Sequence, residues 1–231
     1  MTKIYSEHPK HYVSVDCIIF GYDITDKELK LLLIKRGFEP AKGKWSLAGG
    51  FVQEGESLDE AASRVLRSLT GISDLYMEQL YTYGDVERDP GARVISNAYF
   101  ALIGIHEPDR MKQAKNGAHW RSISDLPDLI FDHRKMVDRA LVELVESIKV
   151  HPVGFELLPE KFTLVQLQSL YEAIYRKTID KRNFRKKILS MNLLDKQEDK
   201  ERETSRKGAY YYRFNEEKYR ELTRNGSFFN L

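Results

Sequence analysis

One stretch of the chain, residues 49–72, constrains the fold more than any other. It reads GGFVQEGESLDEAASRVLRSLTGI, which is two glycines, a polar loop and an amphipathic run that stops at another glycine. Ser57 and Glu60 stand at the spacing of a helix capping box, and Gly71 is placed to end the helix. The run therefore predicts a helix after the polar loop, with one apolar face made of Leu58, Ala62, Val65, Leu66 and Leu69.

Extended segments surround this helix on both sides. The β-branched and aliphatic runs YVSVDCIIFGY and LKLLLIKRG predict a hairpin, because the polar turn DITDKE separates them. KGKWSLAGGFV, LYMEQLYTYGD and RVISNAYFALIGI add strands, and FDHRKMVDRALVELVESIK predicts a second helix. The order strands, helix, strands, helix predicts a mixed α+β domain over residues 1–150, an α/β/α sandwich with a mixed sheet.

The last third of the chain predicts a different domain. Two prolines and a glycine in VHPVGFELLPEKFT predict a linker over residues 151–160. Beyond it, TLVQLQSLYEAIYRK predicts a helix capped by Thr163, and DKRNFRKKILSMNLL predicts a helix capped by Asp180. A highly charged stretch, the strand YYYRFN and a short helix follow. This order predicts a winged helix-turn-helix domain over residues 161–231.

Charge sets the two parts apart. Residues 155–231 contain 17 Lys and Arg against 12 Asp and Glu, a balance of +5, whereas residues 1–154 balance at −3. The asymmetry suggests different partners, although a charged surface alone is usually just solvated. No apolar run reaches about 18 residues, which argues against a membrane span, and the single cysteine, Cys17, cannot form an internal disulfide. We therefore expect a cytoplasmic protein with no membrane partner.

The stretch 49–72 resembles the signature of Nudix domains. That signature reads Gly, five residues, Glu, seven residues, then Arg-Glu-aliphatic-x-Glu-Glu-x-Gly-aliphatic. Matching residues stand at Gly50, Glu56, Arg64, Leu66, Gly71 and Ile72. The three helix glutamates fall on Val65, Ser68 and Leu69, so the box is degenerate. The resemblance implies a Nudix-like fold for the front domain.

Loss of these glutamates removes the metal site that a Nudix hydrolase needs. Carboxylates at i, i+3 and i+4 share one helix face, where they can hold Mg²⁺ against a substrate diphosphate. Valine and leucine offer no oxygen ligand, and serine offers a weak neutral one. The six histidines are scattered, with no pair at zinc-motif spacing. We therefore predict no catalytic residue, no metal and no cofactor, and keep residual Nudix hydrolysis through other acids as an alternative.

The back of the chain resembles the winged helix of the NrtR family of Nudix-related transcriptional regulators. The resemblance rests on LLPEKFTLVQLQSLYEAIY, DKRNFRKKIL and YYYRF, and upstream on YTYGDVERDPGARVISNAYFALI. It places residues 180–189 in the position of a DNA recognition helix. Because one short helix covers few base pairs, we expect a homodimer on a near-palindromic double-stranded operator.

Hydrogen-bond donors crowd the first half of this helix. Arginine, lysine and asparagine can pair with base edges or hold phosphates, and we predict Arg182, Asn183 and Arg185 as base readers. A solvated basic face is the plainer explanation for this segment taken alone. The DNA-binding residues predicted for helix and wing together are Lys181, Arg182, Asn183, Arg185, Lys186, Arg206 and Lys207.

If the front domain is a sensor, its pocket should reuse the Nudix cleft. An indole with a few carboxylates and guanidinium groups suits a sugar. Each candidate also has a plain structural explanation, such as core packing for Trp45 or turn formation for two of the aspartates. The predicted effector-binding residues are Arg36, Trp45, Glu56, Asp85 and Asp89.

The resemblance implies one of two effectors. Some NrtR-type regulators respond to ADP-ribose and control nicotinamide cofactor genes, and a branch with degenerate boxes, the AraR type, responds to L-arabinose. The missing glutamates, and Ala48 in place of the proline of GKWxLPGG, favour the second branch. We thus expect a repressor of sugar-utilisation genes that L-arabinose releases from DNA. An ADP-ribose-responsive regulator of NAD metabolism is the alternative, and a non-catalytic nucleotide- or RNA-binding adaptor is a weaker one.

Overall fold

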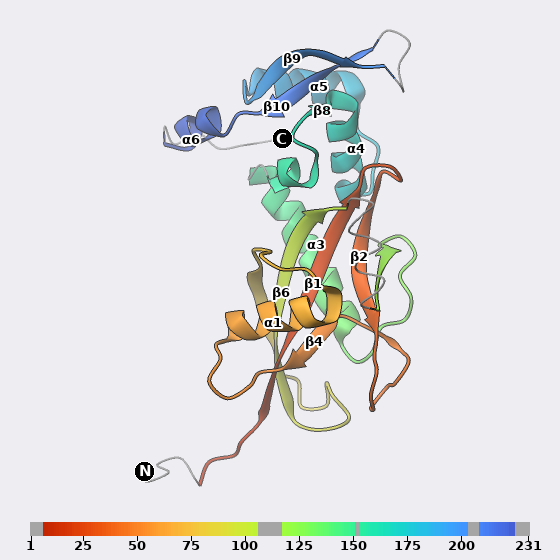
Figure 1. Ribbon diagram of the computed structural model, residues 1–231, viewed down its shortest axis with the longest axis vertical. Coiled ribbons are helices and arrows are strands. Elements are labelled where there is room, and N and C mark those ends of the chain that lie inside the picture. The colour runs from red at the N-terminus through yellow and green to blue at the C-terminus, as the bar shows by residue number, and fades with distance from the viewer. Residues whose placement is uncertain (1–6, 106–116, 151–152, 203–207, 225–231) are drawn as a thin grey trace.

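The computed structural model describes residues 7–105, 117–150, 153–202 and 208–224. The molecule is elongated, with a sheet-based domain at one end of the long axis and a smaller helical domain at the other (Figure 1). No helix within these ranges is long and apolar enough to cross a membrane.

A seven-stranded mixed sheet forms the first domain. Its strands are β1 (Tyr12–Asp23), β2 (Glu28–Lys35), β3 (Trp45–Ser46), β4 (Ala48–Phe51), β5 (Glu78–Tyr83), β6 (Val94–Gly104) and β7 (Ala118–Ser122). They lie in the order β3-β2-β1-β6-β5, with β4 paired to β1 and β7 to β2. The long central strands β1 and β6 run parallel, and the other pairings are antiparallel.

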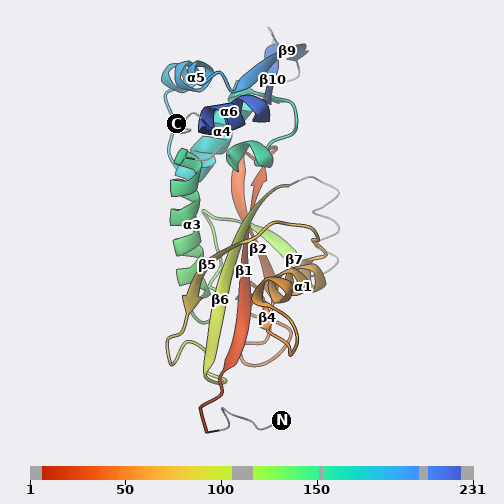
Figure 2. The same cartoon turned by 90° about the vertical axis from the view of Figure 1, so that its left-hand side faces the viewer.

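One helix covers each face of the sheet. Helix α1 (Leu58–Thr70) lies on one side and α3 (His133–Val150) on the other (Figures 1 and 2). Successive residues of β1 point to opposite faces, so Cys17 packs in the apolar cluster of α1 and Ile18 in that of α3. The predicted α/β/α sandwich is confirmed.

Helix α1 begins and ends where its sequence predicts. The Ser57 hydroxyl accepts a hydrogen bond from the Glu60 amide at 3.3 Å, and the Glu60 carboxylate accepts one from the Ser57 amide at 2.8 Å. Gly71 adopts φ +75° and donates its amide to the carbonyl of Arg67 at 2.9 Å. This left-handed geometry is why glycine stands there.

The second domain is the predicted winged helix. It contains the 3₁₀ helix η1 (Val153–Leu157), β8 (Phe162–Thr163), α4 (Leu164–Tyr175), α5 (Lys181–Ser190), β9 (Leu194–Glu201), β10 (Ala209–Phe214) and α6 (Glu216–Arg224). The strands form a small sheet in the order β8-β10-β9. Helices α4 and α5 make the helix-turn-helix, and the hairpin of β9 and β10 is the wing (Figure 1).

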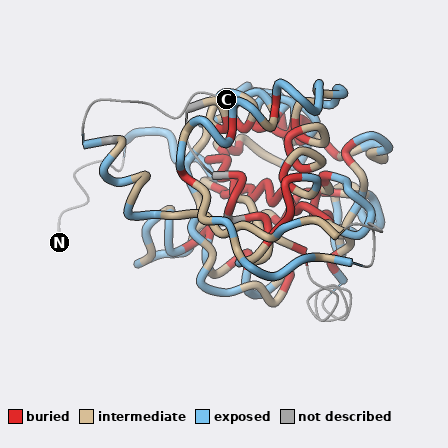
Figure 3. Tube along the Cα trace, turned by 90° about the horizontal axis from the view of Figure 1, so that it is seen from above, coloured by how far each residue is buried: buried red, intermediate tan, exposed pale blue. Residues whose placement is uncertain are grey.

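The segment predicted as a linker, residues 151–160, is a packed connector in its described part. Phe155, Leu157 and Leu158 are buried, and the Phe155 ring stacks on Phe214 with ring centroids 4.3 Å apart. One apolar cluster runs from the sheet face beneath α3 through this segment into the winged helix. Seen along the long axis, the buried residues gather at the centre of the molecule (Figure 3). The two domains therefore share a core.

Candidate functional site

Helix α5 presents a polar face away from the core. Asp180 caps its start, where a carboxylate oxygen accepts the Asn183 amide hydrogen at 2.8 Å. Phe184 and Ile188, one turn apart, are buried. At 100° per residue, Arg182, Asn183 and Lys186 then point away from the core, and all three are exposed. This is the geometry a recognition helix needs in a DNA groove.

The other predicted DNA-binding residues take different positions. Lys181 is exposed at the first turn of α5, but it lies on the side of the helix that carries Phe184 and not on the polar face. Arg185 is half-buried, and its Nε is buried without a hydrogen-bond partner among the described residues. Arg206 and Lys207 lie outside the described residues, so the structure does not place them.

The turn before α5 is held by side chains of α4. Glu172 Oε1 accepts the Ile179 amide hydrogen at 2.9 Å and a hydrogen of Gln168 Nε2 at 3.0 Å. The same Gln168 nitrogen donates to the Ile179 carbonyl at 3.0 Å. Arg176 ends α4 in the left-handed conformation, with φ +53°. Two hydrogen bonds to Ile179, supported by the one between Gln168 and Glu172, thus fix the chain immediately before the cap of α5.

Two lysines and a tyrosine form a cationic surface on the wing. The ammonium groups of Lys196 and Lys200 lie 3.6 Å and 4.3 Å from the ring centroid of Tyr210. A hydrogen bond from Lys200, together with both positive charges, lowers the pKa of the Tyr210 hydroxyl. The predicted DNA-binding residues of the wing, Arg206 and Lys207, did not include these two lysines. The structure shows that they share one exposed ring.

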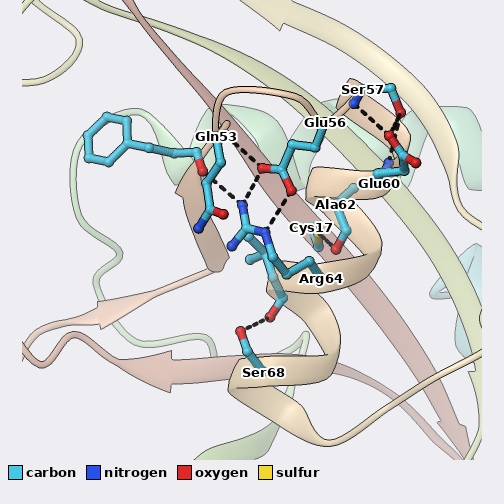
Figure 4. Close-up of polar contacts among 10 residues, drawn as sticks. Cys17, Gln53, Glu56, Ser57, Glu60, Ala62, Arg64 and Ser68 are labelled. Atoms are coloured by element: carbon cyan, nitrogen blue, oxygen red, sulfur yellow. Dashed lines mark hydrogen bonds and ion pairs between the residues drawn. The ribbon is translucent and has the colours of Figure 1, made fainter.

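Glu56, predicted to bind the effector, accepts hydrogen bonds from neighbouring residues of the chain (Figure 4). Arg64 donates to its two carboxylate oxygens at 2.8 Å and 2.6 Å, and the Gln53 amide donates to it at 2.7 Å. The hydrogen bonds from Arg64, and to a lesser extent the one from Gln53, lower the pKa of Glu56 to about 2. Arg64 also donates to the Phe51 carbonyl at 2.9 Å. Glu56 and Arg64 thus clamp the loop that leads into α1.

The side chains at the three positions of the missing glutamates do not form a set of oxygen ligands for a metal. Val65 is buried and packs on Gly50, where an added Cβ would lie 2.8 Å from a Val65 methyl. The Ser68 hydroxyl donates to the Val65 carbonyl at 3.0 Å (Figure 4). Leu69 packs against the apolar cluster of α1. The described residues contain no group of three or more His, Cys, Asp or Glu arranged to hold a metal.

The loops at the end of the sheet far from the winged helix bring several predicted effector residues together. The guanidinium of Arg36 lies 4.0 Å from the ring centroid of Phe38 and 5.5 Å from that of Phe131. The Asp89 carboxylate accepts the Gly91 amide hydrogen at 2.7 Å, and Gly91 lies against Pro40 of the Arg36 loop. We call these residues, with loops 36–44 and 84–93, the distal loop end.

The remaining predicted effector residues flank this end. Two cations lie near the Trp45 ring, Arg121 at 4.6 Å and Lys35 at 5.2 Å from its centroid. Its cluster belongs to the α3 face of the sheet, whereas Glu56 belongs to the α1 side. Asp85 is exposed, and its carbonyl accepts a hydrogen bond from Arg93 at 3.0 Å. The structure therefore does not gather all five residues into one pocket.

Sequence analysis missed a buried charge cluster behind the distal loop end. Arg88 donates to both carboxylate oxygens of Asp132, at 2.9 Å and 2.8 Å, and lies 3.6 Å from Asp16. Ser96 donates to the same Asp16 carboxylate at 2.6 Å. All four residues are buried. The available signal was an aspartate within the apolar run YVSVDCIIFGY, since a buried carboxylate requires a partner.

His133 completes this cluster as a neutral acceptor. Its Nδ1 accepts the Leu47 amide hydrogen at 3.1 Å, and its Nε2 lies 3.6 Å from Asp16. Burial lowers the pKa of the imidazole. The cluster ties loop 84–93 through Arg88 to the central strand β1 and to the start of α3, so it holds the distal loop end in place.

Comparison with known proteins places both halves of the chain. The NUDIX domain profile matches residues 10–140, and the profile of the NrtR DNA-binding winged helix domain matches residues 154–214. A relative from Acinetobacter baylyi, described as an ADPR responsive transcriptional repressor NtrR, is 31% identical over 213 residues. That alignment covers 90% of this chain and 84% of the relative.

Solved structures agree over nearly the whole length. Shewanella oneidensis NrtR complexed with a 27mer DNA is 30% identical with a TM-score of 0.77, and the match covers 95% of this chain and 99% of that one. The NUDIX domain of the same protein complexed with ADP ribose is 29% identical with a TM-score of 0.52, over 62% of this chain and 99% of that one. With a Nudix domain followed by this winged helix, the chain belongs to the NrtR family.

Proposed function

We propose that this chain is a homodimeric transcriptional repressor that binds a near-palindromic operator and leaves it when ADP-ribose binds the Nudix domain. The relative from Acinetobacter baylyi is described as an ADP-ribose-responsive repressor, and the Shewanella Nudix domain was crystallised with ADP ribose. Neither relative is described as responding to a pentose, so L-arabinose and sugar-utilisation genes lose their support. Genes of NAD metabolism become the proposed targets.

The observation that carries the DNA-binding part is the exposed face of α5. Arg182, Asn183 and Lys186 offer guanidinium, amide and ammonium donors from one side of a helix whose other side is buried. Arginine pairs well with guanine and asparagine with adenine in the major groove. Lys196 and Lys200 add positive charge on the wing, which suits phosphates.

The distal loop end supports an anionic effector. Arg36 of this end lies against the Phe38 ring, and Lys42 and Lys44 belong to the same loop. On its flank, Lys35 and Arg121 lie against the Trp45 ring. None of the five has an ion-pair partner among the residues that the structure describes. Unpaired cations attract a diphosphate, and an aromatic ring can stack on adenine. A neutral pentose can pack on a ring, but it has no negative charge for these cations to attract.

With these cations, the domain can bind a diphosphate even though it lacks the metal-binding glutamates. Side-chain cations can supply the counter-charge that Mg²⁺ supplies in a hydrolase, and they do so without activating water. We therefore propose binding without hydrolysis. Arg36 is the central residue of this proposal, because its guanidinium lies near two rings and its loop contacts the loop of Asp89 through Pro40 and Gly91.

Calorimetric titration of the full chain with ADP-ribose tests the effector. We expect binding without added metal and at least a tenfold weaker affinity for Arg36→Ala, since a charged hydrogen bond to phosphate is lost. Arg134→Ala is the matched control, because Arg134 is an exposed arginine of α3 that pairs with Asp138 at 3.0 Å. Binding of L-arabinose and not ADP-ribose would overturn the proposal.

A further inference from the structure

One apolar side chain lies on the otherwise polar face of helix α5. Leu189 is 45% exposed, and it belongs to neither of the two apolar clusters found among the described residues. Its neighbours in the chain behave differently, since Ile188 is buried and Met191 packs against the cluster that contains Ile188. Leu189 therefore does not serve the core of the winged helix.

Helical geometry places Leu189 in line with the residues proposed to read DNA. It follows Arg182 by seven residues, which is about 20° short of two full turns, and it follows Lys186 by three. The buried side chains of Phe184 and Ile188 lie across the helix from Arg182 and Lys186. The exposed face thus runs from Arg182 through Lys186 and carries a leucine in its last turn.

The polar neighbour in this last turn uses its hydrogen-bond donor within the helix. Ser190 Oγ donates to the Lys187 carbonyl at 2.7 Å. Helix α5 lies at the end of the molecule remote from the Nudix sheet (Figure 2), so the Nudix domain does not cover this turn. An exposed leucine, rather than a hydrogen-bond donor, is therefore what the end of the reading face presents.

The C5-methyl group of thymine is the apolar feature that base edges offer in the major groove. Leucine can bury this methyl group, whereas it can form no hydrogen bond with the donors and acceptors of the other bases. At a rise of 1.5 Å per residue, Leu189 lies about 10 Å along the helix axis from Arg182, which corresponds to about three base-pair steps. Leu189 and Arg182 can therefore contact different base pairs of one half-site.

We propose that Leu189 contacts the methyl group of one thymine in each operator half-site, about three base pairs from the base that Arg182 reads, and determines specificity at that position. The contact distinguishes bases by burial of a methyl group and not by hydrogen bonding. This inference rests on the proposed function, since it requires α5 to enter the major groove of an operator.

The test removes the methyl group from the DNA and the side chain from the protein. The full-length wild-type chain selects an operator from a random DNA duplex pool, and each thymidine of a half-site is then replaced in turn by deoxyuridine, which pairs identically and lacks only the methyl group. At one position we expect wild type to bind about fourfold more weakly, the effect of one buried methyl group. Leu189→Ala should bind the thymidine and deoxyuridine duplexes of that position equally and respond like wild type at the others.

Two further variants separate this contact from a general effect on the winged helix. Leu189→Met keeps an apolar side chain that can reach the methyl group, so it should retain the response to deoxyuridine. Val165→Ala removes another exposed aliphatic side chain, 41% exposed on α4, and should leave that response unchanged. Thermal unfolding of all variants identifies any that misfold.

The outcomes separate this inference from the proposed function. If wild type selects an operator but binds every deoxyuridine duplex as tightly as the original, or if Leu189→Ala still prefers thymidine at the same position, the role of Leu189 is wrong and the proposed function stands. If wild type selects no operator at all, the proposed function fails, and this inference fails with it.

Discussion

The carboxylate of Glu56 and the guanidinium of Arg64 meet in a two-point ion pair, with nitrogen–oxygen distances of 2.8 Å and 2.6 Å. The pair joins the first glutamate of the Nudix signature to its arginine and closes the loop before α1. Both residues survive in this chain, whereas the glutamates that would bind a metal do not. The loop clamp and the catalytic site are therefore separable parts of the signature.

This ion pair should make the free energy of unfolding depend on pH in the acid range. The folded-state pKa of Glu56 is lowered from 4.5 to about 2, so its contribution is fully present above pH 4.5 and is lost as the pH falls through 2. Glu56→Gln should therefore unfold at lower urea than wild type at pH 7, and the difference should vanish near pH 2. Glu54→Gln, an exposed neighbour in the same loop, should show no such difference. A gap that persists at pH 2 would contradict the assignment.

ADP-ribose should not be hydrolysed. Val65, Ser68 and Leu69 supply no carboxylate, and Glu56 is held by Arg64 and Gln53. Product formation would be followed by chromatography with Mg²⁺ or Mn²⁺ over a wide range of enzyme concentration. Turnover that rises with protein and disappears in Glu56→Gln would establish residual hydrolase activity.

Arg88 should be a large contributor to stability. Its removal leaves Asp16 and Asp132 buried near each other without their cation, and breaking a buried ion pair costs about 3–5 kcal/mol. Arg93→Ala, in the same loop, removes only hydrogen bonds to the carbonyls of Gly84 and Asp85 and should cost about 1 kcal/mol per bond. Urea unfolding compares the two variants. Equal losses would mean that the charge cluster is not a structural centre.

Sequence analysis predicted local features well. The capping pair of Ser57 and Glu60, the stop at Gly71 and the caps Thr163 and Asp180 all depend on neighbours within a few residues, and the structure confirms them. The cluster of Arg88 depends on residues 16, 96, 132 and 133, which only the tertiary fold brings together. Packing of Phe155 on Phe214 is equally non-local, so proline and glycine content alone suggested a linker.

The identity of the effector is harder to predict from the sequence than these local features. The missing metal glutamates remove one counter-charge for a diphosphate, but side-chain cations can supply another. Lys35 and Arg36 are neighbours in the sequence, but Arg121 comes to lie near them, against Trp45, only in the fold. Within the described residues, none of these three cations forms an ion pair. The predicted roles of Asp85 and Asp89 remain predictions.

Base reading by α5 should be residue-specific. Arg182→Ala should cost about 1–3 kcal/mol on the selected operator and relax the preference at one base position, because the side chain points away from the buried face of the helix. Lys200→Ala, on the wing, should weaken all sequences evenly and reduce the salt dependence. Binding is measured by fluorescence anisotropy across single-base operator variants. An unchanged preference in Arg182→Ala would remove this residue from the reading set.

ADP-ribose and operator DNA are expected to weaken each other's binding to this chain. The most direct measurement titrates wild-type protein into fluorescent operator with and without saturating ADP-ribose, in metal-free buffer, and repeats the titration with L-arabinose. We predict that ADP-ribose weakens operator binding about 5- to 150-fold and that L-arabinose has no effect. Unchanged operator affinity with saturating ADP-ribose, or release by L-arabinose, would contradict the account.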